Sequence, residues 1–538
     1  MNIDNKIVLA FEALDQNNIN KSINLATEIE KDILSIPETT NYLLYHNLCG
    51  LLIDIGSSKG DENIIKRGID TGERILPHIQ NEKHLFSNYY NLANGYLCIW
   101  TLRQYDCIDQ GTIDDSYFKA KDFYLHAHLL LKSIQQQLSD IQIAQFYVNY
   151  ANCLDSLHRS VDAISNYENA LKYLPNMPEA LGNKGITLRH LAPLVRGHTH
   201  LFYIEAKKLL EKALEYSPPP HMVRPFKENL LYVDRIIQAH KKMEIEPINR
   251  PVPVNNFERF TQKICLENHL YLTPTTMIGD DEFVVLGDPM YLSGILEIQQ
   301  QPGRPERIIT FINQLKQEYI MARYFFIQGL SSSKNIASIY KNVELYSPLD
   351  YSLEGPYIQL LKTSLRSSMD LLDKMAVFVH DYFRIKKGKD RYIYFRNIWT
   401  ESPNPYKLKP EFKESKNIFA FALSDIAREL SFGGHLNHLI GLRNALTHRF
   451  LVVHDIIHPE QLNTDIKRIK FRDFINDCLT ALTISKSSIM YLILLIDTEE
   501  RKKKKGNYIL KKIPLSPTEK INSWSPSFLE NKSDNELS

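Results

Sequence analysis

The chain has 538 residues, of which 43% are hydrophobic and 24% charged, and its formal net charge is +1. This composition excludes a wholly disordered chain, and the near-zero net charge excludes a basic field over the whole molecule, so nucleic acid could bind only at a local site. A usual size of roughly 150 residues per domain predicts two to four domains.

Residues 1–245 repeat a pattern of small and large residues at helical spacing. The positions that carry the pattern in two successive stretches are Tyr147, Tyr150, Ala151, Leu154, Ala163, Tyr167, Ala170 and Pro175, then Leu181, Gly185, Leu188, Ala206, Leu210, Ala213 and Pro218. Two helices approach closely only where Ala or Gly leaves room. The pattern resembles tetratricopeptide (TPR) repeats, which implies a helical solenoid with a concave surface for a peptide or protein ligand. A purely structural scaffold is the alternative.

Three prolines within residues 244–257 interrupt the helical periodicity and predict the end of the repeat half. Residues 246–355 form a connecting region, in which 283–289 is a short strand or buried loop and 307–330 is a helix by its apolar period of about 3.6 residues. We expect the two halves to be separable at this boundary. The tail, residues 504–538, is Lys-, Ser-, Pro- and Asn-rich and is expected to be disordered.

Residues 356–503 are expected to form a bundle of helices at 357–385, 417–430, 435–453 and 471–500. The first of these helices turns a charged stripe away from its Leu, Met and Phe stripe. The stripe consists of Lys362, Arg366, Asp370 and Asp373, with Lys374 at its edge. A charged stripe of this kind is either an ordinary solvated face or an RNA-binding one.

The loop at residues 384–399 alternates basic and aromatic side chains. The basic ones are Arg384, Lys386, Lys387, Lys389, Arg391 and Arg396, and the aromatic ones are Tyr392, Tyr394, Phe395 and Trp399. Basic side chains hold phosphates and aromatic rings stack on unpaired bases, so this loop is the best candidate in the sequence for contact with single-stranded RNA.

The third helix of the bundle contains an R-N-x-x-x-H pattern formed by Arg443, Asn444 and His448. Asn444 and His448 are four residues apart and share a helix face with Asn437 and Gly441, whereas Arg443 starts from another face and would bend its guanidinium back. The spacing alone fits two interpretations. One is a polar seam around a reacting phosphate, and the other is an ordinary core histidine beside a solvated arginine.

Four antiparallel helices with this motif on the third resemble the HEPN (higher eukaryotes and prokaryotes nucleotide-binding) superfamily. The stretches "CLENHLYLTP", "INQLKQEYIMARYFF", "LLKTSLRSSMDLLDKMA" and "LRNALTHRFLVV" are similar to a bacterial branch in which TPR-type repeats precede the HEPN domain. The likeness covers about residues 255–500 and implies an all-α fold: a repeat solenoid followed by a HEPN four-helix-type bundle.

The resemblance implies metal-independent RNA cleavage, in which the 2'-hydroxyl beside the scissile phosphate is the nucleophile. It implies that His448 is the acid or base, that Arg443 holds the phosphate oxygens, and that Asn444 orients the His ring or donates to the phosphate. The candidate RNA-binding residues are Lys362, Arg366, Lys374, Lys386, Lys387 and Arg391, with Asp370 as a possible auxiliary group.

One motif supplies one histidine, whereas the reaction needs both a base and an acid. HEPN nucleases resemble one another in dimerising across this helix, so a homodimer would supply a second His448. We expect Leu439, Leu442 and Leu446, with the apolar stripe of residues 357–385, to provide the flanking surface. Some HEPN proteins carry a modifiable Tyr two residues after the His. Phe450 stands there in this chain, which leaves the repeat half as the expected regulator.

The resemblance favours a toxin-like endoribonuclease that acts in stress or phage defence, with the repeat half as its sensor. The alternative is a non-catalytic RNA- or protein-binding adaptor whose HEPN bundle only dimerises. We expect no cofactor and no metal, because the six cysteines lack C-x-x-C spacing and Cys265 with His269 cannot complete four ligands. The N-terminus lacks a signal-peptide apolar run, so we expect a cytoplasmic protein without membrane contact.

Overall fold

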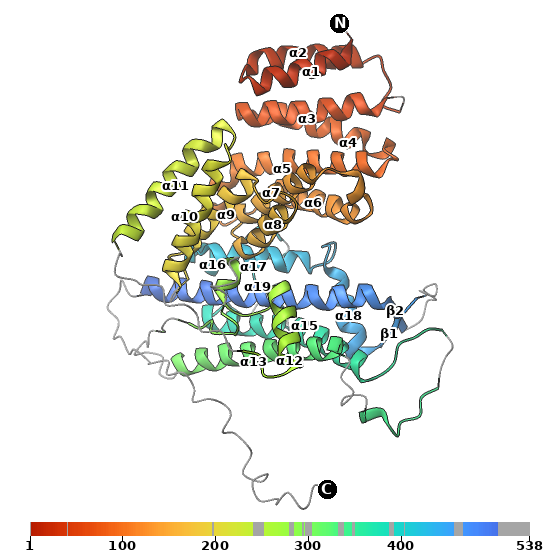
Figure 1. Ribbon diagram of the computed structural model, residues 1–538, viewed down its shortest axis with the longest axis vertical. Helices are drawn as coiled ribbons and strands as arrows, with labels where there is room; N and C mark the ends of the chain where they lie inside the picture. The colour runs from red at the N-terminus through yellow and green to blue at the C-terminus, as the bar shows by residue number, and fades with distance from the viewer. Residues whose placement is uncertain are drawn as a thin grey trace, which may run out of the picture.

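The computed structural model consists of two halves stacked along the long axis of the molecule, and it confirms the predicted all-α fold (Figure 1). Helices α1 to α11 form the N-terminal half. The later helices form the C-terminal half, with one two-stranded sheet at its edge. The structure describes residues 2–39, 41–195, 198–239, 252–278, 285–292, 295, 304–331, 338–346, 350–386, 392–402, 404–456 and 466–503.

The N-terminal half is a stack of helical hairpins. Its helices are α1 (Ile3–Asp15), α2 (Ile19–Ile33), α3 (Tyr42–Lys59), α4 (Glu62–Ile75), α5 (Glu82–Gln110), α6 (Asp115–Ile134), α7 (Asp140–Ser156), α8 (Ser160–Tyr173), α9 (Pro178–Leu191), α10 (Thr199–Glu215) and α11 (Pro220–Ala239), with 3-10 turns η1 (Leu76–His78) and η2 (Gln135–Gln137). The side chains of Asp61, Asn81 and Asp114 accept backbone N–H groups at the starts of α4, α5 and α6. Gly60 and Gly111 end α3 and α5 at φ 68° and 70°, where glycine is unstrained.

The small residues of the repeat pattern lie where paired helices meet. Ala151 and Ala163 are fully buried between α7 and α8. A Cβ on Gly185 would lie 3.2 Å from the backbone oxygen of Ala206, so α9 approaches α10 closely only because this residue has no side chain. The paired helices expected from the pattern are therefore present, whereas their assignment as TPR repeats stays a prediction.

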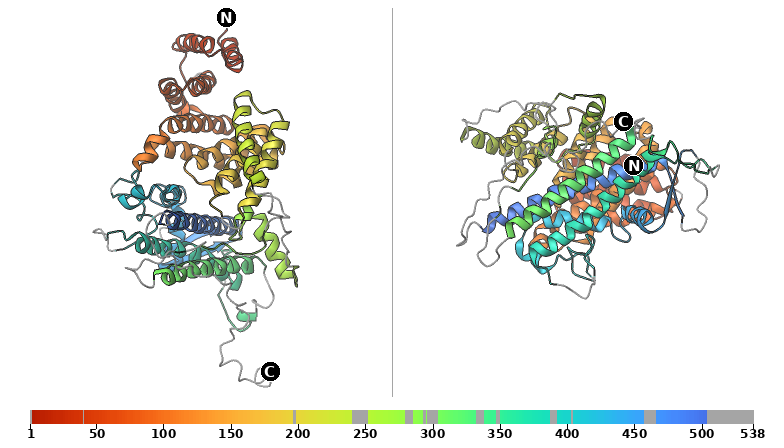
Figure 2. Two further views of the ribbon diagram at one scale, coloured as in Figure 1. Left: turned by 90° about the vertical axis from the view of Figure 1, so that its left-hand side faces the viewer. Right: turned by 90° about the horizontal axis from the view of Figure 1, so that it is seen from below.

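The C-terminal half is a helical bundle around α19. Its elements are α12 (Asn256–Glu267), η3 (Pro274–Met277), α13 (Arg304–Ser331), η5 (Ser338–Tyr340), α15 (Pro356–Phe383), α16 (Pro410–Ser415), α17 (Ile418–Glu429), α18 (Asn437–His448) and α19 (Phe471–Lys503). Helix α15 packs against α13, α18 and α19, and α17 packs on α19 (Figure 2). The helix expected at residues 307–330 is therefore part of this bundle. Helix α19 is long and apolar enough to cross a membrane by length and composition alone, yet 83% of its apolar window is buried inside the protein.

The prediction of one helix through residue 453 is wrong at its C-terminal end. Helix α18 stops at His448, and the next residues form strand β1 (Phe450–His454), which pairs in parallel with β2 (Ile466–Lys470). The apolar run after His448 contains two valines, which suit a strand as well as a helix. Farther upstream, the described part of the expected strand or loop at 283–289 is loop.

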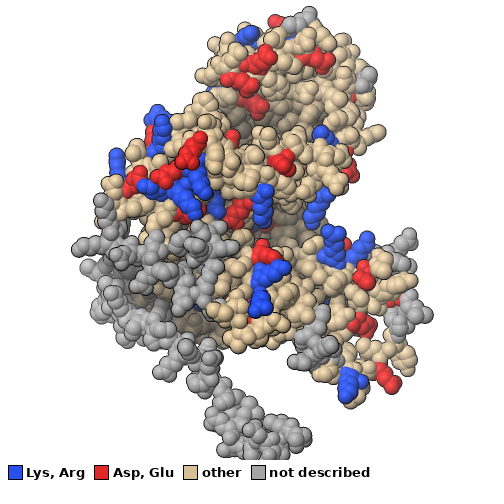
Figure 3. Space-filling view, in the orientation of Figure 1, with Lys and Arg blue, Asp and Glu red and all other residues tan. Residues whose placement is uncertain are grey.

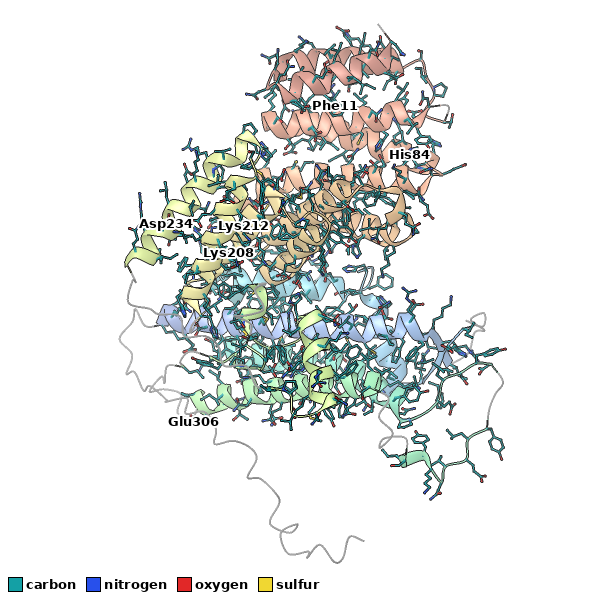
Figure 4. All side chains as sticks on the ribbon, viewed as in Figure 1. Phe11, His84, Lys208, Lys212, Asp234 and Glu306 are labelled. Atoms are coloured by element: carbon teal, nitrogen blue, oxygen red, sulfur yellow. The ribbon has the colours of Figure 1, made fainter. Side chains whose placement is uncertain are left out.

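The two halves share one continuous apolar core, while a second, smaller core is formed mainly by α1 to α4. Side chains fill the space between the halves (Figure 4). Buried charges also cross this junction. Arg159 pairs with Asp425 at 3.0 Å and with Glu429 at 2.5 Å, and Lys121 pairs with both acids.

A second set of polar contacts crosses the junction at α19. The hydroxyl of Tyr491 donates to Asp162 at 2.9 Å and accepts the backbone N–H of Val161 at 3.1 Å. The Arg501 guanidinium donates to the backbone oxygen of Pro193 at 2.7 Å. This packing argues against the expected separability of the halves. Most of the proline-containing boundary lies outside the described residues.

Candidate functional site

The motif on α18 places Asn444 and His448 on the exposed side of the helix. His448 is the last residue of α18, its side chain is exposed, and it has no hydrogen-bond partner within the described parts of the chain. The opposite face carries Leu439 and Leu442, which are buried in the core. Because the helix is anchored by this apolar face, its polar face is held toward solvent. The interpretation of His448 as a core histidine is therefore wrong.

Arg443 reaches across to α15, where two carboxylates hold its guanidinium. Its Nε donates to Asp370 Oδ1 at 2.7 Å, and its Nη2 donates to Asp373 Oδ2 at 3.1 Å. Its Nη1 lies 3.4 Å from Asn444 Oδ1. The charged stripe predicted on α15 thus meets α18 at the motif, so it is not simply solvated along its length.

Asp373 was missed as a site residue by sequence reasoning, although it lies on the same stripe as Asp370. Its Oδ1 accepts the backbone N–H of Phe395 at 3.0 Å, while Oδ2 accepts from Arg443. Asp373 therefore ties the segment after α15 to the motif arginine. The only sequence signal for it was the spacing of three residues from Asp370 on a helix.

A family comparison covers this part of the chain. Residues 299–499 match the model of the LA2681-like HEPN family. These residues form a HEPN domain. The matched range contains α13, α15, α17 and α18 in full, and it begins upstream of residue 356, the expected start of the HEPN domain. No curated protein matches the chain. HEPN domains are typically ribonucleases, and the match indicates a nuclease or another RNA-related role.

Four of the basic residues expected to bind RNA are described, and their surroundings differ. Lys374 is paired with Glu318 at 2.6 Å. Lys362 is half-buried, and burial lowers the pKa of its ammonium group. Arg366 and Lys386 are exposed. On the molecular face shown in Figure 3, cations and anions are interspersed, as the near-zero net charge predicts.

The basic and aromatic loop after α15 is only partly a surface. Phe395 and Trp399 are buried in the core, so their rings cannot stack on RNA bases. Tyr392 is 62% exposed and Tyr394 is 38% exposed. The predicted RNA contacts Lys387 and Arg391 lie outside the described residues, as does Lys389.

The apolar surface expected to flank the motif is also buried. Leu439 and Leu442 belong to the core, Leu446 packs against it, and the apolar stripe of α15 is buried as well. The exposed apolar residues closest in sequence to the motif are instead Phe450, at 70%, and Ile456, at 71%. Phe450 begins β1, and Ile456 follows the end of this strand by two residues; the sequence analysis did not predict this strand.

The structure also places the cysteines and the possible metal ligands. Four of the six cysteines are buried and all six are free thiols. Cys265 is buried, whereas His269 pairs through Nε2 with Glu168 Oε2 at 3.1 Å, so the two do not act as a ligand pair. Over the described ranges, no three His, Cys, Asp or Glu side chains are grouped to hold a metal ion.

Proposed function

We propose that the HEPN domain is a metal-independent endoribonuclease whose reactive surface is the polar face of α18. The observation that carries the proposal is that α18 bears both an exposed His448, which has no hydrogen-bond partner among the described residues, and an arginine that α15 holds beside Asn444. A histidine in this position is accessible to an RNA strand, and imidazole is a side chain that can act as a general acid or base.

The chemistry needs two proton transfers and charge stabilisation. A base takes the proton of the 2'-hydroxyl, and its oxygen attacks the neighbouring phosphorus. The bond to the 5' oxygen then breaks, and that oxygen receives a proton from an acid. His448 fills one of these two roles. Two of the Arg443 nitrogens are taken by Asp370 and Asp373, so its Nη1 side and the Asn444 amide are the groups that face the phosphate.

We propose that the second proton-transfer group is His448 of another copy in a homodimer. An isologous contact brings two copies of one motif to a shared cleft without new residues. The exposed side chains of Phe450 and Ile456 supply apolar area near the motif in place of the buried leucines. Light scattering at micromolar concentration should give a dimer mass. A monomer that cleaves RNA at the full rate would contradict this arrangement.

We propose further that the N-terminal half senses a peptide or protein ligand and controls the nuclease as a toxin-like defence effector. The supporting observation is that α17, which lies at the junction of the two halves, is followed directly in the chain by the motif helix α18. Helix α17 carries Asp425 and Glu429 at the junction and leads through a tight turn into α18. A Cβ on Gly434 in this turn would lie 2.3 Å from the backbone oxygen of Glu429, so the turn has little room to adjust. A pocket of about 240 Å³ lies beside it, lined by Lys121 and Arg428 among others.

The test of the nuclease proposal uses the full-length protein and a 5'-labelled RNA in excess chelator. We expect cleavage to persist and to leave 2',3'-cyclic phosphate ends. Expression of the wild-type protein should also arrest growth, and His448→Ala should relieve the arrest without loss of soluble protein. Cleavage that stops in chelator and returns with magnesium or manganese would contradict the mechanism. RNA binding without cleavage by the wild-type protein would favour the non-catalytic adaptor.

A further inference from the structure

The charge balance around Arg443 leaves the motif short of positive charge. One guanidinium faces the two carboxylates Asp370 and Asp373, at 2.7 and 3.1 Å. An RNA phosphate that approaches this group therefore meets a net negative cluster rather than a free cation. Since binding of a nucleic-acid backbone depends on positive charge, another cation must lie near the same face of α18 if RNA is to be held there.

Lys467 of β2 is such a cation. Its Nζ lies 3.1 Å from the position that a Cβ on Gly441 would occupy. Gly441 lies on the helix face that also carries Asn444 and His448. Strand β2 is held in place by β1, where Lys467 is opposite Leu451, three residues after His448. The strand pair thus places Lys467 beside the exposed polar face of α18.

The ammonium group of Lys467 makes no hydrogen bond or ion pair within the described residues, although the residue is half-buried. Burial lowers the pKa of its ammonium group, and Asp477 opposes that effect. Asp477 itself is paired with His438 at 3.0 Å. The ammonium group of Lys467 is therefore a partly desolvated donor without an anion of its own, beside a glycine that leaves space next to the helix backbone.

We propose that Lys467 binds the RNA phosphate next to the scissile one and so sets the position of the strand on α18. The inference rests on the nuclease proposal and adds a substrate-binding residue to it. Gly441 precedes His448 by seven residues, which is about 10 Å along a helix axis. That separation exceeds the reach of a single phosphate group, so Lys467 acts on a neighbouring phosphate. It is a positioning residue, and it takes no part in proton transfer.

The test measures binding of a short single-stranded RNA by fluorescence anisotropy over a range of salt concentrations, in a His448→Ala background that does not cleave. Lys467→Met keeps the length of the side chain and removes its charge. We expect it to weaken binding about tenfold and to reduce the slope of log Kd against log salt concentration by about 0.7, the value for one lost phosphate contact with single-stranded nucleic acid. Lys467→Arg should restore both.

The matched control is Lys470→Met, which removes an exposed lysine from the other side of the same strand. It should leave the affinity within about twofold of the parent. A second variant leaves the charge of Lys467 unchanged. Gly441→Ala places a Cβ in the space beside Nζ, so it should displace the ammonium and weaken binding by a smaller factor, without lowering the melting temperature, because Ala is favoured over Gly in a helix interior.

The outcomes separate this inference from the nuclease proposal. Wild-type cleavage with Lys467→Met equal to Lys470→Met in affinity and salt slope would overturn the role of Lys467 and leave the nuclease proposal standing. Binding that depends on Lys467 in a wild-type protein that never cleaves RNA would support the phosphate site and overturn the nuclease. An absence of both binding and cleavage would overturn both.

Discussion

Arg159 and Arg443 are both held by several acidic side chains, yet their surroundings differ. Arg159 at the junction of the halves contacts Asp162, Asp425 and Glu429, and its side chain is only 7% exposed. Arg443 on α18 contacts two aspartates of α15 and is 23% exposed, five residues before an exposed histidine. Arginine–carboxylate pairs therefore join the two halves at the junction, whereas the pairs at α18 are open to a ligand.

The two charged clusters differ in how far water can reach their side chains. At the junction, water cannot replace a lost partner, so each charge depends on the others. At α18, water and an RNA phosphate can both reach the groups, so one partner can be exchanged for another at small cost. Burial, rather than residue type, separates the structural cluster from the candidate site.

Removing one acid from the junction should have the largest effect on stability. Glu429→Ala leaves Arg159 and Lys121 with one buried carboxylate fewer, which typically costs about 3–5 kcal/mol. The measurement is the urea midpoint of the full chain, followed by circular dichroism. Glu414→Ala, which removes an exposed acid next to the same helix, is the control and should leave the midpoint unchanged. Equal midpoints for the two variants would mean that the junction charges do not stabilise the fold.

Acid should weaken the junction as Glu429 becomes protonated. Burial raises the pKa of Glu429, but the positive charges of Arg159 and Lys121 lower it by more. The pKa of Glu429 is therefore about 2. Because the folded pKa lies below the unfolded value of about 4.3, this group stabilises the fold above about pH 4.3, and that contribution is lost as the pH falls toward 2.

The measurement for this prediction is the free energy of unfolding between pH 5 and pH 2.5. The loss attributable to Glu429 is on the order of 3 kcal/mol over the full titration. Glu429→Gln lacks the titrating group and should show a shallower decline than wild type across the same range. A decline of equal steepness in both proteins would assign the acid sensitivity to other groups.

Neutralising the exposed cluster should have a small effect on stability and a visible one on binding. Asp370→Asn combined with Asp373→Asn should change the free energy of unfolding by no more than about 1 kcal/mol, because the pairs are partly solvated. RNA binding in the His448→Ala background should tighten, because the net charge at Arg443 becomes positive. Weaker RNA binding in the double variant would show that the carboxylates chiefly hold the guanidinium in a binding geometry.

The sequence was most informative where one helix carries its own pattern. The bounds of α13, α15 and α19 lie close to the expected ones, because each has a long apolar face with a period near 3.6. The shared face of Asn444 and His448 follows from their spacing alone. Local sequence patterns do not indicate contacts between segments that are distant in the chain. The wrong predictions involve such contacts.

Three features of the site depend on such distant contacts. Strand β1 forms because residues 466–470 pair with it, and no residue pattern near Phe450 indicates this pairing. The buried state of Leu439 follows from the packing of α18 on α15, so a leucine expected at an interface lies in the core. Lys467 reaches Gly441 only through the strand pair. Each would require knowledge of the fold before it could be inferred.

The most direct test of the central claim compares RNA cleavage by wild type, His448→Ala and Thr447→Ala. Thr447 is also exposed on α18 and adjoins His448, and its hydroxyl donates only to the backbone oxygen of Arg443, so its loss controls for changes to the helix. Loss of the proton-transfer group should lower kcat/KM by about 10²- to 10⁴-fold, with the melting temperature unchanged. Thr447→Ala should stay within about threefold of wild type. Equal rates for wild type and His448→Ala would contradict the account and remove the α18 face as the reactive surface.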